Sequence, residues 1–153
     1  MASTRQEMFE YLQQLVGQPF IYGYKTSDCD LYDLGFGKKI IARNYKGEFR
    51  EVCTHIIHAV CPFNVIWRNS DCRTETYDEN TTYKVFHSCA KRMIGLTVKQ
   101  IKLSDKNDLW LDFGDCTVVF LSLENEKESW RFFMWGEKNP HLVVSNTWLE
   151  FNY

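Results

Sequence analysis

The chain has 153 residues, with 18 basic and 20 acidic side chains and 11 Phe, 8 Tyr and 5 Trp. This length suits one domain, and a charged fraction of 25% is ordinary for a folded protein, which excludes wholesale disorder. The formal net charge of -2 removes the strongly basic character that is typical of nucleic-acid binders.

The first predicted element is an amphipathic helix that docks on a sheet. Ser3 or Thr4 can cap it, and Gly17 is a natural stop. Its apolar stripe has helical spacing and consists of Met8, Leu12, Leu15 and Val16. Short strands follow at residues 20–24, 31–36, 38–41, 48–60 and 63–67, with polar loops at 69–71 and 77–82.

A second helix is predicted from about residue 82 to 94, capped by Asn80 or Thr81 and ended by Gly95. Five strands then follow with short connections, at 96–103, 108–113, 116–123, 129–134 and 142–144. We interpret them as an antiparallel meander that a final strand at 148–151 closes. The sequence therefore predicts a single α+β domain over residues 1–153, with two helices on a largely antiparallel sheet, and leaves a half-barrel open.

The compartment expected from the sequence is the cytoplasm. Residues 1–14 are charged and lack the apolar core of a secretory signal, and apolar runs such as 118–121 are too short to cross a bilayer. In a reducing compartment we expect no disulfide framework, and most of the cysteines should be small buried apolar groups. The six cysteines are Cys29, Cys53, Cys61, Cys72, Cys89 and Cys116.

One segment resembles a family of small uncharacterised bacterial proteins. The run from Thr54 to Pro62 is similar to their Leu-His-x-x-Cys-Pro-Trp-Arg segment, although Phe63-Asn64 stands where Trp-Arg is expected. Further matches extend the similarity over roughly residues 50 to 151. They are Asn69-Ser70-Asp71, Leu109-Trp110-Leu111-Asp112-Phe113, Glu128-Ser129-Trp130-Arg131-Phe132 and Pro140-His141-Leu142-Val143-Val144. Proteins of this pattern resemble toxin-neutralising immunity proteins, which implies a binding protein with a protein partner.

A cluster of cysteine and histidine is the clearest local motif. Cys53, His55, His58 and Cys61 are ligand types that zinc prefers. Because the segment is predicted to be a strand, Cys53 and His55 should point to one face and His58 to the other, so the four should not converge on one ion. We assign no metal, cofactor or catalytic residue. Cys53, His55 and His141 would line the pocket of the alternative, a small-ligand or metal-dependent enzyme.

Charge is unevenly distributed along the chain. Residues 36–50 hold five basic and one acidic side chain, while residues 102–128 hold seven acidic and three basic ones. We expect the acidic group to form a rim that steers a basic partner, such as a toxin domain, with Trp110 as an aromatic anchor. The predicted partner-binding residues are Asp105, Asp108, Trp110, Asp112, Asp115, Glu124, Glu126 and Glu128. An ordinary solvated sheet edge remains open, and so does a homodimer formed through a sheet edge.

Overall fold

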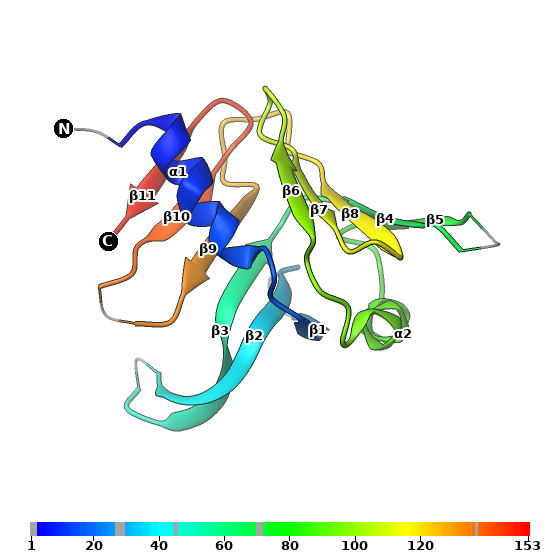
Figure 1. Cartoon of the computed structure of the whole chain (residues 1–153), viewed down its shortest axis with the longest axis horizontal. Coiled ribbons are helices and arrows are strands. Elements are labelled where there is room, and N and C mark those ends of the chain that lie inside the picture. Colours follow the sequence, from blue (N-terminus) through cyan, green and yellow to red (C-terminus); the bar gives the residue numbers. More distant parts are fainter. Residues whose placement is uncertain (1–2, 27–29, 45, 70–71, 137) are drawn as a thin grey trace.

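Two antiparallel sheets face each other across one core in the computed structural model, which describes residues 3–26, 30–44, 46–69, 72–136 and 138–153 (Figure 1). The six-stranded sheet has the order β1 (Phe20–Lys25), β2 (Tyr32–Arg43), β3 (Phe49–Ala59), β9 (Trp130–Met134), β10 (His141–Val144) and β11 (Leu149–Asn152). The five-stranded sheet has the order β5 (Thr74–Tyr77), β4 (Phe63–Trp67), β8 (Cys116–Phe120), β7 (Leu109–Asp112) and β6 (Gln100–Leu103).

The chain crosses between the sheets at one corner. There β3 leads into β4 and β8 leads into β9, and β3 pairs with β9 just as β4 pairs with β8. The corner is held by backbone bonds: Leu121 N donates to Pro62 O at 2.9 Å, and Val60 N donates to Ser129 O at 3.0 Å. The α+β prediction is confirmed, and the sheets do not close into a barrel. The prediction that these five strands form one meander is wrong, because β9 and β10 belong to the six-stranded sheet, whereas β6, β7 and β8 belong to the five-stranded one.

The helices fill the two open edges between the sheets. Helix α1 (Arg5–Leu12) is capped by Thr4, whose hydroxyl accepts from Glu7 N, and runs on into a 3₁₀ turn (Gln13–Leu15). Helix α2 (Tyr83–Met93) is capped by Thr82, one residue beyond the predicted caps. Neither helix, nor any other in the described part of the chain, is long and apolar enough to cross a membrane.

Aromatic rings hold each helix against the inner faces of the sheets. On α1, the Tyr11 ring lies 5.4 Å from that of Phe132 in β9. On α2, the Phe86 ring lies 4.9 Å from that of Tyr32 in β2 and 5.6 Å from that of Phe63 in β4. One buried cluster contains residues of both sheets and includes the rings of Phe132, Tyr32, Phe63 and Phe86. Because the helices lie on the inner side, the outer faces of both sheets are available to form sites.

Two strands differ from the sequence expectation. The predicted strands at 31–36 and 38–41 form the single long strand β2, which bends at a register shift between Phe36 and Lys39. Gly37 lies in this shift with φ = 91°, a conformation that disfavours other residues. Strand β5 was not predicted, because its Thr-Glu-Thr sequence is polar and gains its pairing only from β4.

Candidate functional site

The predicted acidic rim is divided between the two ends of the five-stranded sheet. Asp108 directly precedes β7 and Asp112 ends it. Four residues of extended chain place these two positions about 13 Å apart. Asp105 lies in the β6–β7 turn beside Asp108, whereas Asp115 lies in the β7–β8 turn beside Asp112. The structure therefore brings the acidic residues together as two groups rather than as one rim.

Three loops meet at the end that holds most of the acidic residues, here called the acidic end (residues 104–108, 121–129 and 145–148). Asn107 joins them. Its Oδ1 accepts from Arg5 Nη1 at 2.7 Å, its Nδ2 donates to Ser145 O at 2.8 Å, and its backbone oxygen accepts from Trp130 Nε1 at 3.0 Å. Asn107 is buried, and its φ of 66° suits an asparagine. This fully bonded side chain fixes the surface on which the carboxylates stand.

Three of the predicted carboxylates are occupied by partners within the chain. Asp108 Oδ1 accepts from Ser122 N at 2.7 Å, which ties the β6–β7 turn to the β8–β9 connection. Asp112 pairs with Arg68 at 3.1 Å, and Glu128 accepts from Arg131 at both carboxylate oxygens. These side chains shape the surface, and they are less available to a partner.

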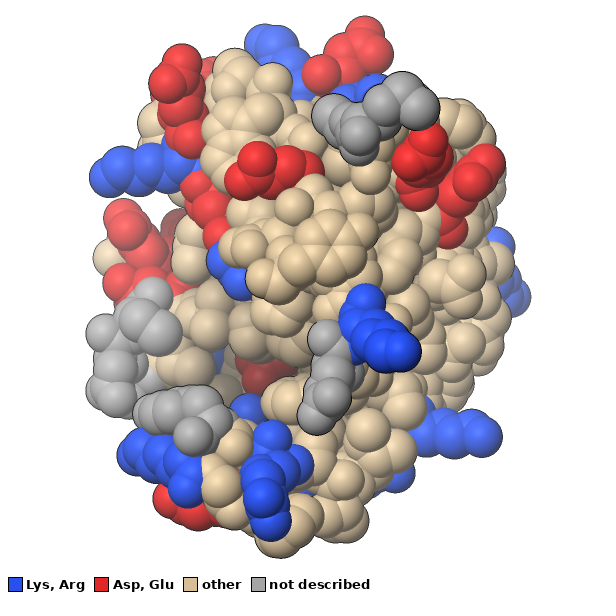
Figure 2. Space-filling view, turned by 90° about the vertical axis from the view of Figure 1, so that its left-hand side faces the viewer, with Lys and Arg blue, Asp and Glu red and all other residues tan. Residues whose placement is uncertain are grey.

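The other four carboxylates are exposed and make no ion pair within the described residues. They are Asp105, Asp115, Glu124 and Glu126. In Figure 2 most acidic side chains lie in the upper part of the face, among some basic ones, and basic side chains predominate at its lower left. Figure 1 places the basic β2–β3 hairpin far from the acidic end.

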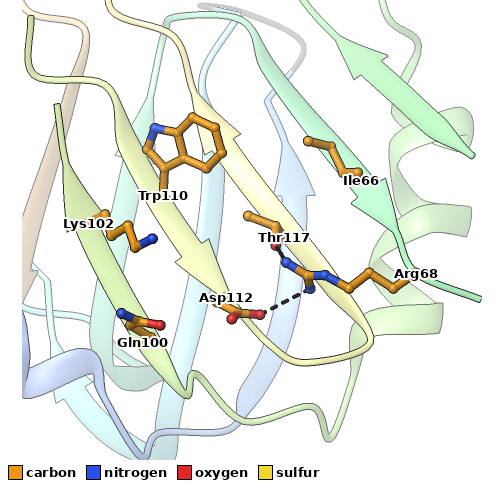
Figure 3. Close-up of a pocket in the computed structure, with 7 residues that line it drawn as sticks. All are labelled: Ile66, Arg68, Gln100, Lys102, Trp110, Asp112 and Thr117. Carbon is orange, nitrogen blue, oxygen red and sulfur yellow. Dashed lines mark hydrogen bonds and ion pairs between the residues drawn. The ribbon is translucent and has the colours of Figure 1, made fainter. Parts of the chain in front are cut away.

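Trp110 lies on the uncovered outer face of the five-stranded sheet. Its side chain is 41% exposed, which is high for a tryptophan in the middle of a sheet. The register places Lys102 and Val119 on either side of it, in β6 and β8. A shallow cavity of about 190 Å³ lies on this face. Its lining residues are those drawn in Figure 3, namely Ile66, Arg68, Gln100, Lys102, Trp110, Asp112 and Thr117.

Arg68 is held across the end of this face. The guanidinium reaches from the end of β4 over β8, donates to Asp112 Oδ1 at 3.1 Å and to Gly114 O at 3.0 Å, and also bonds Thr117 Oγ1 (Figure 3). These bonds fix a guanidinium at one end of the cavity that Trp110 also lines, so that little side-chain entropy remains to be lost on binding. Sequence reasoning missed Arg68 and Lys102, because only the pairing of β4, β8, β7 and β6 brings them to the same cavity as Trp110.

The predicted Cys and His cluster does not converge. The His55 ring stacks 6.3 Å from that of Phe132, while the His58 ring lies edge-on, 5.1 Å from that of Phe133. Adjacent residues of a strand face opposite sides, so the two histidines lie on opposite faces, as expected. Cys53 packs with Phe133 on the side of His58, so its predicted place beside His55 is wrong. The register shift at Gly37 accounts for this reversal. Cys61 belongs to the main core.

The buried thiols are poorly suited to nucleophilic chemistry. Cys53, Cys61, Cys89 and Cys116 are buried, as expected, and Cys72 is exposed, whereas Cys29 lies outside the described residues. Burial raises the pKa of Cys53 to about 11 and that of Cys61 to about 12. A thiol with such a pKa is almost entirely protonated near neutral pH.

Neither a group of metal ligands in the described part of the chain nor a similar known protein indicates a function for this protein. Among the described residues, no three His, Cys, Asp or Glu side chains are grouped so that they could hold a metal ion. No protein-family model, curated protein or solved structure matches this chain. The features of the chain that bear on its function are therefore its own exposed residues and cavities.

Proposed function

We propose that this chain is a non-catalytic protein-binding protein of the immunity type, which binds a basic toxin domain. Trp110 carries the proposal, because it is exposed on an uncovered sheet face and lines the same cavity as the fixed guanidinium of Arg68. Tryptophan and arginine are the residue types most enriched among binding hot spots. The surrounding strands give this face a rigid backbone, so binding requires little rearrangement.

The exposed carboxylates support a basic partner. Asp115 lies at one end of the five-stranded sheet, and Asp105, Glu124 and Glu126 lie at the other, so they flank the face that Trp110 occupies. Carboxylates around an aromatic centre raise the rate of encounter with a positively charged surface. A nuclease toxin would offer such a surface, since its cleft must hold phosphates.

The test is co-expression with the product of the adjacent reading frame, followed by growth and binding measurements. We expect the chain to protect the cells, and Trp110→Ala to weaken the complex by about 2 kcal/mol, roughly 30-fold. Reversing Asp115 and Glu124 to Lys should slow association several-fold at low salt and reduce its salt dependence. Ile41→Ala is the matched control, since Ile41 is exposed on the distant β2–β3 hairpin. Equal affinities for Trp110→Ala and Ile41→Ala would contradict the proposal.

A further inference from the structure

A second, larger hollow lies on the outer face of the six-stranded sheet. Its volume is about 640 Å³, within the range of about 300 to 1,000 Å³ that small-molecule sites occupy. One wall is aromatic and consists of Phe133, Trp135 and His141, and Arg43 and Arg50 of the β2–β3 hairpin stand on the other side. Figure 2 shows a hollow above the basic side chains at its lower left, with an acidic side chain visible inside it. This hollow is here called the hairpin groove.

The aromatic wall is ordered by stacking. The His141 ring lies 4.1 Å from that of Phe133 at an interplanar angle of 7°, and the His58 ring packs edge-on against the same phenyl ring. Cys53 and Ile56 pack behind Phe133 in a small apolar cluster of their own. A flat ring that enters the groove could therefore extend an existing, ordered stack of rings.

The polar groups of the groove are mainly donors. Arg131 Nη1 lies 2.9 Å from His141 Nδ1, and because a guanidinium can only donate, Nδ1 must be the unprotonated nitrogen. The neutral ring therefore carries its proton on Nε2. Trp135 Nε1 is buried and has no hydrogen-bond partner among the described residues, which is a costly state for a donor. Arg50 makes no ion pair within the same part of the chain. No described lining residue is a carboxylate, but the carboxylate of Asp33 lies 3.4 Å from Nε2 of the lining residue His58.

We infer that the hairpin groove binds a small ligand that combines a planar ring with an anionic group, either a phosphate or a carboxylate. The ring extends the stack that Phe133 and His141 already form, and the anion is held by Arg50. The groove is on the opposite sheet from Trp110, so this inference does not rest on the proposed function.

The test is titration of the full chain, labelled with ¹⁵N at tryptophan, while the indole N–H signals are followed by NMR. The Trp135→Phe variant assigns the Trp135 signal. Two ring-bearing anions, adenosine 5′-monophosphate and indole-3-acetate, separate phosphate from carboxylate ligands. Ribose 5-phosphate, acetate and adenosine supply the anion or the ring alone.

We expect at least one ring-bearing anion to shift the Trp135 signal with a dissociation constant below about 1 mM, and the compounds that lack the ring or the anion to bind at least about tenfold more weakly. Arg50→Gln should weaken binding by about tenfold, because Arg50 is exposed and its replacement leaves the fold intact. Arg73→Gln is the matched control and should bind as the parent chain does, because Arg73 is an exposed arginine next to β5 in the other sheet. The inference is overturned if neither ring-bearing anion moves the Trp135 signal at about 5 mM, if Trp110 responds instead, or if the anion alone binds equally well.

Discussion

Replacement of Asn107 by Ala should destabilise the protein more than any exposed substitution at the acidic end. The side chain accepts from Arg5 at 2.7 Å and donates to Ser145 O at 2.8 Å, and both bonds disappear in Asn107→Ala. A bond to a charged group contributes about 1.5–3 kcal/mol, and an abandoned buried carbonyl costs about 1–3 kcal/mol. Alanine at a φ of 66° adds about 1 kcal/mol of strain. The expected loss is therefore about 3.5–7 kcal/mol.

Urea unfolding followed by tryptophan fluorescence measures this loss, with the slope of the transition as the check on two-state behaviour. Asn107→Gly separates the two contributions, because glycine loses the same bonds without the strain of a positive φ. It should be more stable than Asn107→Ala by about 1 kcal/mol. Lys106→Ala is the control and should lie within about 0.5 kcal/mol of the parent chain, since Lys106 is exposed. A loss below about 1 kcal/mol for Asn107→Ala would refute the role given to this side chain.

Three further predictions concern other parts of the chain. Burial lowers the pKa of His55 and of His141, so the folded state should lose stability as the pH falls below about 6.5, and His141→Gln should flatten the slope of unfolding free energy against pH between about 7 and 5.5. Gly35→Ala should cost about 1–3 kcal/mol in urea unfolding, because its Cβ would lie 2.1 Å from Tyr22 Cε1 and 2.8 Å from Cys53 Sγ. Among the five described cysteines, thiol labelling resolved by mass spectrometry should modify Cys72 first and the buried four only on unfolding; rapid labelling of Cys53 in the native state would contradict its burial.

The helices and most strands could be predicted because their signals are local. Alternating burial along β4 and the glycine-containing turn between β7 and β8 both follow from neighbouring residues. Local signals do not determine which strands pair with each other. The break between the two sheets falls in the 121–129 connection. The sequence prediction extends the preceding strand to residue 123, which leaves an apparent five-residue loop of hairpin length, so nothing local distinguishes β9 as a strand of the other sheet.

The candidate sites depend on long-range pairing and were only partly predictable. Trp110 and its acidic neighbours are adjacent in sequence, so they could be proposed together. Arg68 reaches Asp112 over a sequence separation of 44 residues, which no local pattern reveals. The hairpin groove needs the pairing of β3 with β9 and of β9 with β10, which brings His58, Phe133 and His141 together.

The formal charge of -2 says little about either site, because the charges that cancel are far apart. Strand β3 connects the two regions. Its last residue, Ala59, pairs with Trp130 beside the acidic end, and its first residue, Phe49, pairs with Arg43 near the tip of the basic β2–β3 hairpin. Ten steps of extended chain between these residues span about 33 Å. At physiological salt the Debye length is about 8 Å, so a partner at one end is screened from the charges at the other. A basic protein and a small anion can therefore each find a complementary surface on this one nearly neutral chain, and added salt should weaken both associations.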